Sequence, residues 1–218
     1  MPSNTVRLHR LLRGAVLACL ALAAACRKPP APSAFQVGEQ QIQIVVPGGW
    51  ESLNQGRQLV LRDDTRKLIL ADLGPATREA YRREIERARE LWESGRESEA
   101  KTRLRELPLR DEPPRFDQML LSIGEMPEAR LDGIVDGALE RLDNKRREVK
   151  SRRALSIDDR EAMDVETWMA LTHADPRRFR FVLNEGRLFM LRDGSELPAP
   201  AAFDAVASSL HFAAGSRK

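Results

Sequence analysis

Hydrophobic residues follow a two-residue period near both ends of this chain and a helical period between them, and this change of period constrains the fold most. Ile42, Ile44 and Val46 alternate with Gln41, Gln43 and Val45 before Pro47-Gly48-Gly49, which is typical of a half-buried strand that ends in a turn. Apolar residues between 77 and 107 recur instead at helical spacing, on both sides of Gly95: Tyr81, Ile85, Ala88 and Trp92, then Ala100, Leu104 and Leu107. The chain therefore predicts an α+β fold, an antiparallel sheet covered by helices as an α/β/α sandwich, with a helical insert at 73–115.

The rest of the chain adds elements of both kinds. In chain order they are a hairpin of 59–61 with 67–71, a strand at 118–123, an amphipathic helix at 131–142, hairpins of 149–156 with 162–171 and of 178–183 with 188–192, and a last helix at 203–210. Pairing the last hairpin across its turn places five side chains on one face: Phe179, Phe181, Leu183, Leu188 and Met190.

The first 25 residues have the three parts of a secretory signal peptide. Arg7, Arg10 and Arg13 precede an apolar run at 14–25 that ends in three alanines, and no acidic residue interrupts them. This run is shorter than the roughly 20 residues that a spanning helix needs, and no later segment is more apolar, so we expect no transmembrane helix. Leu22-Ala23-Ala24-Ala25-Cys26 resembles the lipobox of bacterial lipoproteins. That resemblance implies cleavage before Cys26, a lipid on its thiol, and a place on the periplasmic side of the outer (or inner) membrane. The alternative is ordinary cleavage and a soluble periplasmic product.

Removal of this segment changes the charge and cysteine content of the chain. The whole chain carries +3, with 36 basic and 33 acidic residues. Without the three leader arginines the numbers are equal, so no basic footprint for nucleic acid remains. Cys19 and Cys26 are the only cysteines, so the mature domain is predicted to have no disulfide and no cysteine metal site.

Proline-rich residues 27–34 predict a tether between the modified Cys26 and a single domain at 35–212, with a tail at 213–218. Five pieces of that domain resemble PsbP-like and DcrB-like domains: 35–50 with its Val46-Pro47-Gly48-Gly49-Trp50 ending, the helix at 131–142, Arg160-Glu161-Ala162, the hairpin at Asn184-Glu185-Gly186, and 203–212. The resemblance implies that fold and, for most members, a non-enzymatic accessory or assembly role.

Residues with catalytic potential are few. Outside the leader the histidines are His173 and His211, and Thr172-His173-Ala174-Asp175-Pro176 could supply an oriented base or two metal ligands. It also has the composition of a polar turn, which we prefer. The acidic pairs Asp63-Asp64 and Asp158-Asp159 fall at expected hairpin turns. We therefore predict no catalytic residue, no cofactor and no metal.

Two further features indicate either binding or packing. Leu91-Trp92-x-x-Gly95-x-x-x-Glu99-Ala100 resembles one tetratricopeptide repeat, but no second copy follows, which favours an isolated helical hairpin. That hairpin could dock a partner protein. Trp50 and Trp168 could line a ligand groove, although large aromatics mostly serve the core.

The function expected from these features is a lipid-anchored, non-catalytic module that binds another protein of the cell envelope. The alternatives are an envelope hydrolase that uses carboxylates or His173, and a carrier of a small ligand. A cleft distinguishes them, because an enzyme needs convergent polar groups there and a carrier needs an apolar cavity.

Overall fold

The computed structural model describes residues 31–105, 107, 114–142, 147–170, 172–196 and 198–213. Every described helix and strand belongs to one compact unit, Pro32–Lys218. The expected leader, Cys26 and most of the tail lie outside the described residues. Among the helices that the structure describes, none is long and apolar enough to cross a membrane.

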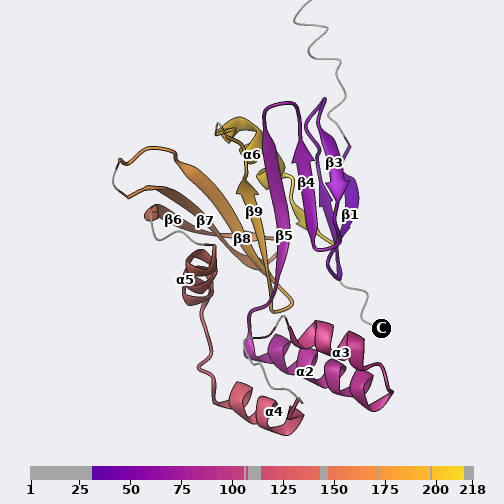
Figure 1. Ribbon diagram of the computed structural model, residues 1–218. Coiled ribbons are helices and arrows are strands. Elements are labelled where there is room, and N and C mark those ends of the chain that lie inside the picture. Colours follow the sequence, from indigo (N-terminus) through magenta and orange to yellow (C-terminus); the bar gives the residue numbers. More distant parts are fainter. Residues whose placement is uncertain are drawn as a thin grey trace, which may run out of the picture. The chain divides into compact units, whose positions relative to one another are not determined.

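A seven-stranded antiparallel sheet is the centre of the domain (Figure 1). Its strands, from one edge to the other, are β3 (Glu51–Asn54), β4 (Gln58–Arg62), β5 (Lys67–Pro75), β9 (Arg187–Asp193), β8 (Arg177–Asn184), β7 (Arg160–Met169) and β6 (Arg147–Ile157). All three predicted hairpins are confirmed, as β4–β5, β6–β7 and β8–β9. The strand β3 was not predicted, because its four residues are all exposed and carry no alternating pattern.

One face of the sheet is covered by helix α6 (Pro200–Ser208) and by a small second sheet. That sheet has the order β1-β2-β10, with β1 (Ser33–Val37), β2 (Gln40–Ile44) and β10 (His211–Phe212). Fully buried Ile42 and Ile44 of β2 pack in the same core cluster as Phe189 of β9 and Phe203 of α6. The tether expected through residue 34 thus ends earlier, because Ser33 and Ala34 already pair with β2.

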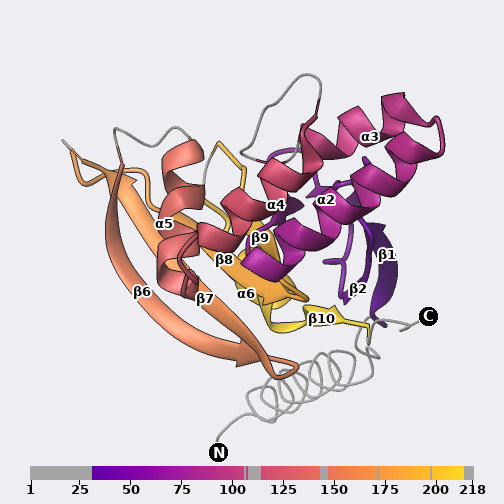
Figure 2. The same ribbon diagram turned by 90° about the horizontal axis from the view of Figure 1, so that it is seen from below.

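The other face is covered by helix α5 (Leu131–Arg141), which confirms the predicted amphipathic helix (Figure 2). Buried Val135 of α5 contacts a layer of sheet side chains that includes Phe181 and Met190. The five side chains predicted to share a face all lie here, Leu183 with partial burial. With α5 and α6 on opposite faces, the α/β/α sandwich is confirmed.

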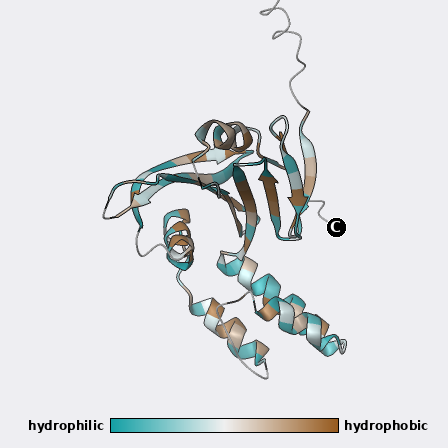
Figure 3. Cartoon of the chain, turned by 45° about the horizontal axis from the view of Figure 1, so that its top comes forward, coloured by the Kyte–Doolittle hydropathy of each residue, from teal (hydrophilic) through white to brown (hydrophobic). Residues whose placement is uncertain are grey.

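Helices α2 (Arg78–Glu93), α3 (Glu97–Leu104) and α4 (Phe116–Glu125) form a separate cluster with its own apolar core. Figure 3 shows mainly hydrophilic colours along α2 and α3, and hydrophobic colours on the central strands. The expected break at Gly95 is confirmed, and this glycine has a φ of +80°. The stripe of Tyr81, Ile85 and Ala88 is buried inside this cluster and is not left exposed.

The strand predicted at 118–123 is wrong, since these residues belong to α4. Met119 and Ile123 are one helical turn apart, and both are buried against α2 and α3. A short apolar run is equally compatible with a strand and with a buried helix, and here the contact with the stripe of α2 determines the helix. Arg89 of α2 also forms an ion pair with Asp117 of α4 at 2.6 Å.

Candidate functional site

The residues singled out for catalysis do not converge. His173 is exposed, and its ring stacks on Trp168 with 4.4 Å between ring centroids. The carboxylate of Asp175 forms ion pairs with Arg147 and Arg177, so it does not orient His173. His211, with 57% of its side chain exposed, lies 2.9 Å from Asp158.

Both acidic pairs lie in turns, as predicted. Asp63 accepts hydrogen bonds from the backbone N–H groups of Thr65 and Arg66, and the side chain of Arg66 is the main reason that its pKa falls to about 2. Asp158 and Asp159 are the two central residues of the β6–β7 turn, with φ values of +49° and +62°. Positive φ at both central positions is the type I′ geometry, which Asp tolerates better than most residues.

Asp158 additionally ties the end of the domain to this turn. Its carboxylate accepts the backbone N–H of Phe212 at 3.0 Å. Burial raises the pKa of Asp158, but the His211 hydrogen bond, the Phe212 N–H and nearby charges lower it by more, so the net direction is down. The carboxylate therefore stays ionised in a structural role.

The two tryptophans lie in different surroundings. Trp50 is half-buried against the core beneath α6, and the guanidinium of Arg66 lies 5.2 Å from its ring centroid. The ring of Trp168 stacks on that of His173, and the amino group of Lys150 lies 5.6 Å from its centroid. Both therefore contribute to packing. Among the described residues, no group of three or more acidic, histidine or cysteine side chains could hold a metal ion.

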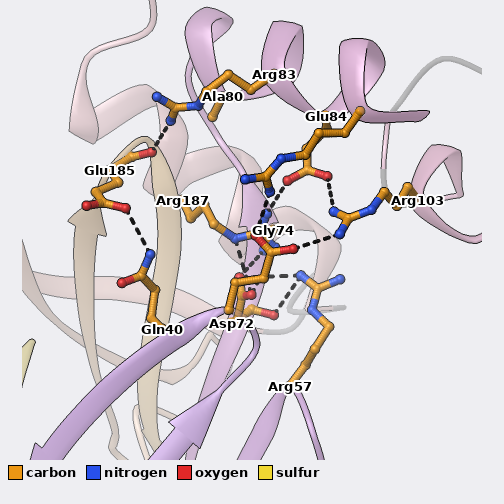
Figure 4. Close-up of polar contacts among 12 residues, drawn as sticks. Gln40, Arg57, Asp72, Gly74, Ala80, Arg83, Glu84, Arg103, Glu185 and Arg187 are labelled. Carbon is orange, nitrogen blue, oxygen red and sulfur yellow. Dashed lines mark hydrogen bonds and ion pairs between the residues drawn. The ribbon is translucent and has the colours of Figure 1, made fainter. Parts of the chain in front are cut away.

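The largest set of convergent polar groups lies where the helical cluster meets the sheet (Figure 4). Seven side chains alternate in sign along a connected chain of ion pairs: Arg57, Asp72, Arg187, Glu84, Arg103, Glu39 and Arg87. They come from the β3–β4 turn, β5, β9, α2, α3 and the β1–β2 turn. We call this set the charge chain.

The middle of the charge chain is buried. Arg187 places Nη2 2.9 Å from Asp72 Oδ2 and Nη1 2.8 Å from Glu84 Oε1. The side chains of Asp72, Glu84 and Arg187 are 0%, 7% and 10% exposed. Asp72 Oδ1 also accepts the backbone N–H of Gly74 at 2.8 Å and lies 3.4 Å from Arg57. A charge at this depth is tolerated only when it is paired and hydrogen-bonded, and each of the three is.

The outer part of the charge chain approaches the solvent. Arg103 bridges Glu84 at 2.8 Å and Glu39 at 2.9 Å, and Arg87 reaches the other oxygen of Glu39 at 2.8 Å. Burial raises the pKa of Glu39, but the hydrogen bonds from Arg103 and Arg87 lower it by more. All these carboxylates are thus committed to cations, which suits a joint between two parts of the fold better than a catalytic base.

The β8–β9 turn closes the same joint. Gly186, with a φ of +78°, accepts the backbone N–H of Ala76 at 2.8 Å, and a Cβ atom there would lie 2.3 Å from Thr77 Oγ1. The backbone carbonyl of Glu185 accepts a hydrogen bond from Arg83 at 2.6 Å. Only glycine permits this approach of the N-terminus of α2 to the turn.

The sequence contains a signal for this joint that hydrophobic periodicity alone does not reveal. Glu84 lies beside Ile85 within the apolar spacing of α2, three residues after Tyr81, and Asp72 interrupts the apolar run of β5. Charged residues at positions whose periodicity predicts burial require partners. Which residues pair with them depends on how distant segments pack.

Comparison with known proteins finds similarity among solved structures only. No family model matches the chain, and no curated protein matches it. Among solved structures, the chain is similar to cyanobacterial PsbP (CyanoP) from Synechocystis sp. PCC 6803, with 13% sequence identity and a TM-score of 0.44. The similarity covers 86% of this chain and 96% of that one. The structural neighbour is thus a PsbP protein of low identity, and the α+β class is established by the strands and helices themselves.

Proposed function

We propose that this protein is a non-catalytic, protein-binding module, held at the periplasmic side of the cell envelope by a lipid on Cys26. The observation that supports a binding role best is the charge chain, which uses its carboxylates to fix a three-helix cluster onto the sheet. A second observation agrees with it: Asp63, Asp158 and Asp175 are committed to turns and ion pairs.

The helical cluster is the docking element in this proposal. Its apolar stripe is already covered, so the binding surface is the outside of α4. Leu121, on this side of the helix, is 68% exposed. Asp117 and Glu125 are exposed on the same helix. The expected occupant is another envelope protein that offers an apolar side chain with cationic neighbours, because these would complement Leu121 and the acidic residues around it.

The anchor is tested by Cys26→Ser. We expect the wild-type protein to sediment with membranes after a salt wash and to yield a diacylated N-terminal peptide in mass spectrometry. The variant should be released from the membrane, because a thiol is needed for the lipid. Membrane retention of the variant after the salt wash would contradict lipid anchoring at this residue.

Docking is tested separately, with a photo-crosslinking amino acid at Leu121 and, as a matched control, at Val149. Both positions are exposed, at 68% and 41%, but Val149 lies on the edge strand β6. We expect one discrete crosslinked product from position 121, and the additional substitution Asp117→Lys should reduce its yield. An adduct from position 149 alone would move the binding surface to the sheet edge.

A further inference from the structure

A second concentration of cations lies at the opposite end of β9 from the charge chain. Arg187 begins this strand, and Arg192 stands five residues later, about 17 Å away at ~3.4 Å per residue. Arg192 borders a hollow of about 270 Å³ that Arg147 and Arg177 also line. Phe179, Leu142 and Ser195 complete much of its wall. We call it the arginine hollow.

Two of the three arginines share one carboxylate. Asp175 accepts a hydrogen bond from Arg147 through Oδ2 and forms an ion pair with Arg177 through Oδ1, at 2.9 Å. The loop before β8 holds Asp175 in the left-handed region, with a φ of +50°, and His173 in the same loop has a φ of +52°. His173 is fixed there by its stack on Trp168 and by its N–H bond to the carbonyl of Met169 at 2.8 Å. Asp and His tolerate this left-handed conformation better than most residues, and in it Asp175 pairs with two guanidinium groups.

The other polar groups of the wall are already in use. Asp193 Oδ1 accepts the N–H of Ser195 at 3.0 Å, and its Oδ2 accepts the N–H of Ala199 at 2.6 Å. The hydroxyl of Ser195 accepts the N–H of Lys67 at 2.8 Å and donates to its carbonyl. Neither side chain forms a hydrogen bond or an ion pair with Arg192.

Arg192 is therefore the cation without a counterion in this wall. It is half-buried, and no hydrogen bond or ion pair joins its side chain to another group in the part of the chain that the structure describes. Among the described residues the lining holds three arginines and one acidic residue, Asp193, and Asp175 pairs with two of those arginines, so the arginines exceed these two carboxylates by one positive charge. The five donors of this half-buried guanidinium bond no acceptor among the described residues, so they are open to an acceptor that a ligand supplies.

We infer that the arginine hollow binds a small organic oxyanion, a carboxylate or a phosphate monoester, through Arg192. The guanidinium fork offers the bidentate geometry that these groups prefer. Phe179 and Leu142 provide an apolar wall for a short carbon body. At ~30 Å³ per water molecule the space holds about nine waters, so it admits a compact anion and not a drug-sized ligand. This inference is independent of the lipid anchor and of the docking surface on α4.

The test is titration calorimetry of the full chain in detergent, with inorganic phosphate, succinate and glycerol phosphate as probes at constant ionic strength. Three proteins are compared: wild type, Arg192→Gln and Arg105→Gln. Arg105 is an exposed arginine at the end of α3, so its exchange removes the same charge from another surface. We expect at least one probe to bind the wild type and Arg105→Gln equally. Arg192→Gln should bind about 10- to 100-fold more weakly, as for the loss of a charge-assisted hydrogen bond.

Two additions keep the result decisive. Thermal unfolding of each variant checks the fold, and Arg192→Lys retains the charge but not the fork, so its affinity should lie between wild type and Arg192→Gln. Vesicles that contain phosphatidylglycerol, compared with free glycerol phosphate, distinguish a lipid headgroup from a soluble anion as the source of the oxyanion. Equal binding by wild type and Arg192→Gln, or no binding of any probe or vesicle, would overturn the inference.

Discussion

Replacement of Arg187 by methionine tests whether the charge chain holds the helical cluster on the sheet. Methionine keeps a long apolar stem but removes the cation between Asp72 and Glu84, whose side chains are 0% and 7% exposed. Breaking a buried ion pair by removal of one partner costs about 3–5 kcal/mol, because the remaining charge stays buried. Arg57 and Arg103 still contact these carboxylates, at 3.4 Å and 2.8 Å. We therefore expect the lower end of that range.

A loss of about 3 kcal/mol lowers Tm by about 6–12 °C in a domain of this size. Urea unfolding followed by circular dichroism gives the free energy, and hydrogen exchange of the α2 amides shows whether the joint opens first. The matched control is Arg66→Met, which breaks an ion pair to Asp63 whose arginine is 49% exposed. Exposed pairs of this kind contribute about 1 kcal/mol or less.

Charge and packing are separated by a triple variant, Arg187→Met with Asp72→Asn and Glu84→Gln. If uncompensated charge causes the loss, the triple variant should recover part of it, because neutral amides are cheaper to bury than carboxylates. If Arg187→Met loses no more stability than Arg66→Met does, the idea that this joint depends on the cation is refuted. A triple variant no more stable than the single one would assign the loss to packing of the arginine stem.

Three more outcomes are expected from the geometry. Gly186→Ala should destabilise the domain by about 1–3 kcal/mol, since it combines strain at a positive φ with a Cβ 2.3 Å from Thr77 Oγ1. The control is Gly124→Ala on α4, whose added Cβ meets nothing within 4 Å and should leave thermal stability unchanged or raise it. His173→Ala should change the free energy of unfolding in urea by less than about 1 kcal/mol and leave the protein's role in the cell intact, as expected for an exposed stacking residue. Loss of that role in a variant of unchanged stability would favour the hydrolase alternative. Burial raises the pKa of Asp164, but Arg180 and Arg153 lower it by more, to below its ordinary 3.8. Its stabilising contribution is therefore complete above that value and is lost as the pH falls through the lower folded pKa, so Asp164→Asn should flatten the acid limb of a stability–pH curve.

The sheet was predictable from the sequence because its signals are local. Alternation in the β8–β9 hairpin placed Phe181 and Met190 on one face, and the turn at Glu185-Gly186 set their register. The helix α5 was predictable for the same reason, since its apolar residues repeat at helical spacing over three turns. Three strands were missed. They are β1, which begins within the residues interpreted as the tether, β3, whose residues are all exposed, and β10, which has two residues.

The error at α4 and the omission of the charge chain have a common physical cause. The run around Met119 and Ile123 becomes a helix because the stripe of α2 offers a groove at helical spacing, and that groove exists only once α2 and α3 are packed. Glu84 and Asp72 were visible as charges at buried positions, but their shared partner is Arg187, more than 100 residues further along the chain. A buried carboxylate requires a cation as its partner, and only the packing of distant segments determines which cation that is. The same reasoning applies to Arg192, a cation at the other end of β9 that forms no ion pair with any residue of the described chain. A ligand would supply the missing counterion of Arg192. The arginines at the two ends of β9 thus differ in role, since Arg187 holds the joint and Arg192 is the proposed binding site.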